Sequence, residues 1–181
     1  MFRVLIISFI VTLLSACSSL PNNLISNNEN IVTDFDQWIA SDLKVANDVR
    51  LGGIIAKVTN LENRTRVEIV NMPISQSGKP DLNSEPQGRY VAYIDGYVES
   101  MSFSQGRLVT FLGTSDGKEK GKVGEYKVIF PVLKAQSFYL WRITETVIVD
   151  EFGSHLSPCW GFHCRGSRSF PSKGRVIQEV K

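Results

Sequence analysis

Residues 49–149 are built from short runs of β-branched and aromatic side chains, and this pattern constrains the fold more than any other feature. In residues 64–70, polar side chains alternate with apolar ones, as they do on a strand that buries one face. Comparable runs cover residues 51–59, 89–98, 107–112, 126–135 and 138–149. Because no long helical period separates these runs, they predict an all-β domain.

The connections between these runs are short and polar. Residues 60–63 predict a hairpin turn, residues 71–87 a long exposed loop and residues 115–125 a hydrophilic hairpin or loop. Pro131 predicts an edge or bulge position, because proline cannot donate to a sheet ladder. Five or six strands so closely spaced predict a small antiparallel β-barrel over residues 48–149, OB-like and five-stranded, with an open sandwich as the alternative.

The segment before the barrel divides into two parts. Residues 18–31 contain five Asn, three Ser and one Pro. This composition predicts a flexible tether over residues 17–32. Over residues 33–47 the period becomes helical, and a short N-terminal helix is expected to lie across the open end of the barrel.

The first sixteen residues form an apolar head that differs from the rest of the chain. Arg3 precedes an apolar run over residues 4–14, which is too short for a bilayer that needs about 20 residues. A charged start followed by a run of this length is typical of a signal peptide, here residues 1–16. Without Arg3 the chain has 19 basic and 18 acidic residues, a balance that argues against a general binder of polyanions.

The head ends in Leu14, Ser15, Ala16 and Cys17, which resemble the bacterial lipobox. The resemblance implies cleavage before Cys17 and a covalent lipid on it, S-diacylglycerol and an N-acyl chain. Because Ser18 is not Asp, the analogy points to the outer membrane of a Gram-negative bacterium. The alternatives are an ordinary secretory signal with a chance cysteine, or a buried core helix.

Seven further runs, in order along the chain, resemble the Slp family of outer-membrane lipoproteins, the starvation-inducible type. They are residues 49–55, 65–69, 88–97, 106–113, 121–126, 130–132 and 139–141. Leu51 departs from the tryptophan expected there, which exchanges one apolar group for another. The resemblance implies a lipid-anchored protein associated with starvation or stress, with the outer membrane and envelope proteins as partners. It implies no established enzymatic activity and supplies no catalytic residues.

One cluster of metal-ligating side chains lies near the end of the chain. His155, Cys159, His163 and Cys164 are residue types that bind zinc. Pro158 and the adjacency of His163 and Cys164 disfavour one tetrahedral site, so a Cys159–Cys164 disulfide is preferred in an oxidising periplasm, with free thiols as the third alternative. No metal or other cofactor is expected. A hydrolase would need one of the two histidines in a cleft beside a serine or carboxylate.

Residues 150–181 are expected to form an irregular, basic and aromatic tail. Its candidate surface contacts, for a lipid headgroup or an anionic glycan, are Trp160, Phe162, Arg165 and Arg168. The alternative is that these aromatic residues cover the barrel. Nucleic acid is excluded as a ligand, because a lipidated protein outside the cytoplasm rarely meets it.

Two functions remain open. The first is a non-enzymatic lipoprotein that supports the envelope. The second is a module that binds a small ligand or glycan on the barrel face, with Tyr90, Tyr93, Tyr97 and Phe103 as contacts, although such aromatic residues more often pack in a core. Surface ion pairs are expected between Arg66, Arg89 or Arg107 and Glu68, Asp95 or Glu125.

Overall fold

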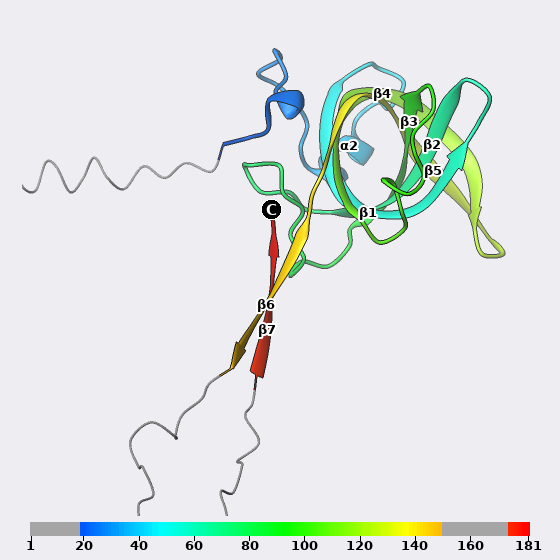
Figure 1. Cartoon of the computed structure of the whole chain (residues 1–181). Coiled ribbons are helices and arrows are strands. Elements are labelled where there is room, and N and C mark those ends of the chain that lie inside the picture. Colours follow the sequence, from blue (N-terminus) through cyan, green and yellow to red (C-terminus); the bar gives the residue numbers. More distant parts are fainter. Residues whose placement is uncertain (1–18, 150–173) are drawn as a thin grey trace, which may run out of the picture. The chain divides into compact units, whose positions relative to one another are not determined.

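The computed structural model describes residues 19–149 and 174–181, which belong to two compact units that meet in sequence after Trp141. The first unit is a closed barrel with the strand order β1-β2-β3-β5-β4 (Figure 1). Its strands are β1 (Asp48–Asn60), β2 (Arg64–Met72), β3 (Gly88–Asp95), β4 (Leu108–Val123) and β5 (Tyr126–Leu140). All pairings are antiparallel except that of β3 with β5. The predicted OB-like barrel is confirmed, and the open sandwich is wrong.

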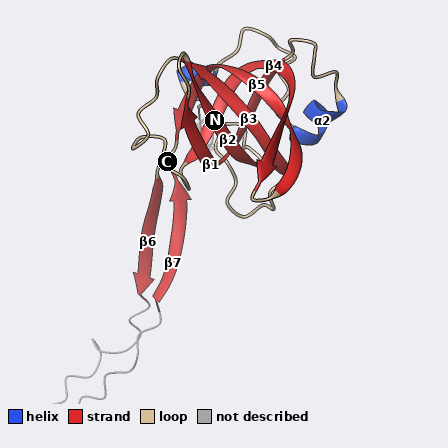
Figure 2. Cartoon of the chain, turned by 90° about the vertical axis from the view of Figure 1, so that its right-hand side faces the viewer, coloured by secondary structure: helices blue, strands red, loops and turns tan. Residues whose placement is uncertain are grey.

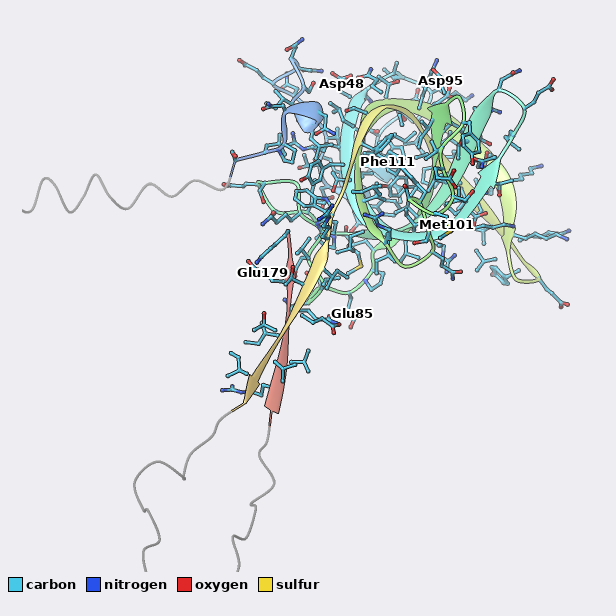
Figure 3. The ribbon with its side chains drawn as sticks, viewed as in Figure 1. Asp48, Glu85, Asp95, Met101, Phe111 and Glu179 are labelled. Carbon is cyan, nitrogen blue, oxygen red and sulfur yellow. The ribbon has the colours of Figure 1, made fainter. Side chains whose placement is uncertain are left out.

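Side chains alternate between the inside and the outside of the barrel along each strand, and the inward ones fill its interior. On β2, Thr65, Val67 and Ile69 are fully buried, whereas Arg64 and Arg66 point to the outer surface. Phe111 lies inside the ring (Figure 3) and is completely buried. A barrel of this size has an interior that side chains can fill, so it encloses a core.

Two glycines allow β1 and β4 to approach their neighbouring strands. A Cβ atom at Gly53 would overlap the carbonyl oxygen of Val70 on β2, and one at Gly113 would overlap the carbonyl oxygen of Lys134 on β5. Both obstacles are backbone atoms, which cannot rotate away. Glycine is therefore required at both positions, where the backbone of the neighbouring strand leaves no room for a side chain.

Of the hairpin or loop expected over residues 115–125, the structure shows a hairpin whose strands are regular sheet. The β4–β5 ladder continues from Lys118, opposite Pro131, to Val123, opposite Tyr126, and the turn follows at Gly124 with a φ of 61°. Before Lys118, two residues of β4 oppose one residue of β5, which places Pro131 beside a bulge as predicted. The β4 strand of this two-stranded extension has polar side chains and Gly121 over residues 118–122, so no apolar alternation marks it in the sequence. The same ladder makes β5 one strand where residues 126–135 and part of 138–149 were expected as two.

A short helix, α2 (Phe35–Ala40), covers one end of the barrel (Figures 1 and 2). Asp34 caps it by accepting a hydrogen bond from the Gln37 backbone N–H at 2.8 Å. Trp38 is fully buried and packs edge-on against Tyr90, with ring centroids 5.9 Å apart. The helix across the open end is confirmed, but it spans six residues and not 33–47.

Residues 19–32, expected to be a flexible tether, lie against the barrel. The 3-10 turn η1 (Asn22–Leu24) buries Leu24 completely, and the Asn23 side-chain amide donates to the carbonyl oxygen of Phe138. Arg50 Nη1 donates to the Leu24 carbonyl oxygen at 3.1 Å. The tether prediction is wrong because buried Leu24 and hydrogen bonds to the barrel strands fix the segment to the surface.

The second unit is a two-stranded antiparallel sheet of β6 (Ile143–Val149) and β7 (Gly174–Val180). The barrel therefore ends at Leu140 and not at residue 149, and residues 174–180 are a strand, where an irregular tail was expected. Paired β-branched residues explain this sheet, since Thr146 faces Ile177 and Val147 faces Val176.

Candidate functional site

The main polar constellation of the barrel lies on the outer surface of β2 and β3, where the β4–β5 extension reaches it. Arg66 on β2 faces Tyr93 on β3 in the sheet register, and Glu119 comes from the extension. Outward side chains of strands 2 and 3 form the surface that OB-type barrels use for ligands. We call Arg64, Arg66, Glu68, Tyr93 and Glu119 the β2–β3 network.

Arg66 is the centre of this network. Its Nη1 donates to Glu68 Oε1 at 2.5 Å, while its Nε and Nη2 donate to Glu119 Oε1 at 2.8 and 2.6 Å. The Tyr93 hydroxyl donates to Glu119 Oε2 at 2.6 Å, and the Arg64 guanidinium stacks 3.9 Å from the centre of the Tyr93 ring. These charge-assisted bonds fix the extension to the barrel wall.

The pKa directions agree with this geometry. Burial acts to lower the pKa of Arg66, but hydrogen bonds to Glu68 and Glu119 and their negative charges outweigh it, so the pKa is raised. Burial raises the pKa of Tyr93, and the hydrogen bond to Glu119 adds to this rise. Two arginines and two glutamates balance one another, so the network neutralises itself. An anionic ligand would have to displace Glu119 from Arg66.

The outer part of the β4–β5 extension carries an open groove of about 620 Å³. Its lining combines three cations with apolar surface: Lys120, Gly121, Lys122, Lys127, Val128 and Ile129. Of these lining residues, Ile129 is 61% exposed, and Tyr126, which precedes Lys127 in the sequence, is 77% exposed. Large exposed apolar groups next to lysines suit a protein partner better than a polar small molecule.

The four aromatic residues predicted as ligand contacts do not form one site. Tyr90 and Phe103 belong to the buried core, so their predicted role as surface contacts is wrong. Tyr93 lies in the β2–β3 network, whereas Tyr97 is 70% exposed and donates to Glu99. Alternation alone did not separate inward from outward tyrosines on β3.

Burial of Tyr90 predicts a loss of stability at alkaline pH. Its hydroxyl donates to the Leu51 carbonyl oxygen at 3.1 Å, and burial raises its pKa well above the usual value. Above about pH 10 the unfolded chain releases this proton and the folded chain keeps it, so the free energy of unfolding falls by up to about 1.4 kcal/mol per pH unit. Below that pH the phenol is neutral in both states and contributes no slope.

The substitution Tyr90→Phe should remove this part of the slope, at a cost of about 1 kcal/mol at neutral pH for the lost hydrogen bond. Urea unfolding at a series of pH values measures both effects. Tyr126→Phe, at a position that is 77% exposed, is the matched control for removal of a phenol hydroxyl. A Tyr90→Phe variant with the full wild-type slope would show that Tyr90 does not titrate on unfolding.

The other predicted site residues fall outside the described part of the chain. They are Cys17, the disulfide pair Cys159 and Cys164, the histidines His155 and His163, and the surface contacts Trp160, Phe162, Arg165 and Arg168. Among the residues that the structure describes, no group of three or more His, Cys, Asp or Glu could hold a metal ion. Within residues 19–149 and 174–181, no helix has the length and apolarity needed to cross a membrane.

Glu119 is the site residue that the sequence analysis missed. Arg66 was correctly paired with Glu68, although both lie on one strand, but the expected cross-strand partners did not include Glu119. The available signal was the alternation of Lys118, Lys120 and Lys122 with Glu119, which fits an exposed strand.

The molecule is therefore a small OB-like barrel whose interior is filled by side chains and whose end is covered by α2. The charges of its β2–β3 network balance one another. A family model, described as the outer membrane lipoprotein Slp family, matches residues 14–165, and the chain belongs to this family. The protein is thus an outer-membrane lipoprotein of a Gram-negative bacterium, as the sequence resemblance predicted.

Three relatives are similar over most of the chain. The outer membrane protein Slp of Escherichia coli K12 is 30% identical over 137 residues, which cover 75% of this chain and 72% of the relative. The lipoprotein YeaY of the same organism is 29% identical over 138 residues, covering 76% and 71%. An uncharacterized protein of Haemophilus influenzae Rd is 33% identical over 115 residues, which cover 63% of this chain and 62% of that relative. No solved structure matches the chain.

Proposed function

We propose that this protein is a non-enzymatic lipoprotein that supports the assembly of envelope components during starvation or stress. Its lipids are attached to Cys17, and its barrel offers a surface to other envelope proteins. The observation that carries the proposal is the filled and capped barrel, in which Trp38, Tyr90 and Phe111 occupy the interior that a ligand would need.

The polar surface supports the same function. In the β2–β3 network, both carboxylates accept hydrogen bonds from Arg66, and Glu119 also accepts from Tyr93. Carboxylates held in this way stiffen the wall and are poorly placed to act as a general acid or base. The groove beside Tyr126 and Ile129 supplies the exposed apolar area that a protein partner would bury.

Affinity capture from intact outer membranes tests the proposal. The acylated protein should retain a specific envelope protein, and Ile129→Asp should lose it, because a charge would enter the apolar part of the contact. Ile129 is 61% exposed, so the variant should fold normally. Met101→Asp, at a position that is 84% exposed and does not line the groove, is the matched charge control. Recovery of lipid alone, with no protein enriched over Ile129→Asp, would contradict the proposal.

A further inference from the structure

The N-terminal segment packs against the barrel where Gly78 lies beside the buried Trp141. Leu20 and Leu24 both lie beside Gly78, where a Cβ atom would be 2.9 and 3.2 Å from their methyl carbons. The Trp141 ring lies 3.8 Å from the same point, and its Nε1 donates to Thr110 Oγ1 at 2.9 Å. We call this set the Trp141 clamp.

A second hydrogen bond ties the clamp to the loop between β2 and β3. The Thr110 hydroxyl donates to the Gly78 carbonyl oxygen at 2.6 Å, and the Gly78 N–H donates to the Ser75 carbonyl oxygen at 2.8 Å. Leu24 is fully buried and Trp141 is 4% exposed. The segment thus meets the barrel within a few residues of the lipidation position in the sequence.

This attachment limits how far the barrel can move from its lipid. Two Cα–Cα steps separate Cys17 from Ser19, so their Cα atoms lie at most about 7 Å apart, and the Leu20 Cα atom lies within about 11 Å of that of Cys17. A flexible tether of the fifteen residues 18–32 would give a root-mean-square separation of about 20 Å. The clamp replaces that freedom with a short, directed connection.

We propose that the Trp141 clamp orients the barrel on the outer membrane, with the turn at residues 75–79 against the lipid headgroups. The inference rests on the proposed acylation of Cys17 and adds the face that meets the membrane. Ser75 and Gln76 are exposed on this turn, and the partly exposed Lys79 can approach a phosphate. A headgroup region is only about 5–8 Å deep on each side, which is comparable to the reach of residues 17–19.

The opposite side of the barrel then faces away from the membrane. Within the barrel unit, the N-terminal segment and the tip of the β4–β5 extension lie on opposite sides of the ring (Figure 1). The tip carries Glu125 and the exposed Tyr126. The orientation therefore presents the groove of the extension to partners outside the bilayer.

Fluorescence quenching measures this orientation directly. The acylated protein, with Cys159 and Cys164 replaced by Ala, is labelled at Gln76→Cys or Glu125→Cys and reconstituted in phosphatidylethanolamine and phosphatidylglycerol vesicles. With a nitroxide on the lipid headgroup, the label at position 76 should be quenched several-fold more than the label at position 125. A fifteen-residue Gly/Ser insertion between Ser18 and Ser19 should remove most of the difference, because it restores a long tether.

Two failures are distinguishable. Acylated, vesicle-bound protein with equal quenching at the two positions would overturn the orientation alone. If mass spectrometry finds no acyl chains on Cys17 and the protein does not float with vesicles, the proposed lipidation fails and the orientation fails with it.

Discussion

Replacing Cys17 with Ala should move the protein from the membrane fraction to the soluble fraction and abolish its labelling by radioactive palmitate. Each buried methylene of an acyl chain contributes about 0.8 kcal/mol, and one chain gives only marginal binding, whereas several chains anchor stably. Within the residues that the structure describes, the barrel buries most of its large apolar side chains in its own core, so the proposed acyl chains would supply the anchor.

The matched control for this experiment is Cys159→Ala, which removes a different thiol and should keep both the label and the membrane fractionation. Thermal unfolding of the released Cys17→Ala protein should be unchanged, because the described barrel begins beyond this residue. Continued palmitate labelling of Cys17→Ala would remove the lipidation proposal, whatever the fractionation.

The barrel could be predicted from the sequence because its inner and outer faces differ in polarity. On β2, buried Val67 and Ile69 alternate with outward Arg66 and Glu68, so the pattern identified a strand. The closure of the barrel was harder to predict from the sequence. The parallel pairing of β3 with β5 joins segments about forty residues apart and uses only three register pairs.

The remaining features depend on contacts that leave no periodic signal. Lys120 and Lys122 face solvent on a strand with little apolar alternation, so the sequence alone did not separate a hairpin from a loop there. The segment around Leu24 is rich in asparagine, and its composition indicated a tether although one leucine and three hydrogen bonds fix it. The conformation of such segments depends on tertiary contacts, which their local composition does not reveal.

The largest expected loss of stability follows removal of the Trp38 side chain. Trp38 closes the end of the barrel, packs on Phe35 at 6.2 Å and on Tyr90 at 5.9 Å between ring centroids, and donates from Nε1 to Ser115 Oγ at 3.1 Å. Trp38→Ala should lower the free energy of unfolding by about 3–5 kcal/mol, because it leaves a cavity next to the core. Urea unfolding of the soluble Cys17→Ala protein measures this as a lower midpoint with an unchanged slope.

Two further variants separate packing from hydrogen bonding at this position. Ile39→Ala, in the same helix but 41% exposed, should cost less than about 1 kcal/mol and controls for helix propensity. Trp38→Phe keeps an aromatic ring and loses the hydrogen bond to Ser115. Its loss in free energy of unfolding should therefore lie between those of Trp38→Ala and Ile39→Ala. The Ser115 hydroxyl still donates to the Leu43 carbonyl oxygen at 2.9 Å and is not left without a partner. If Trp38→Ala lowered the free energy of unfolding no more than Ile39→Ala does, α2 would contribute little to stability. The barrel would then be stable with its end open.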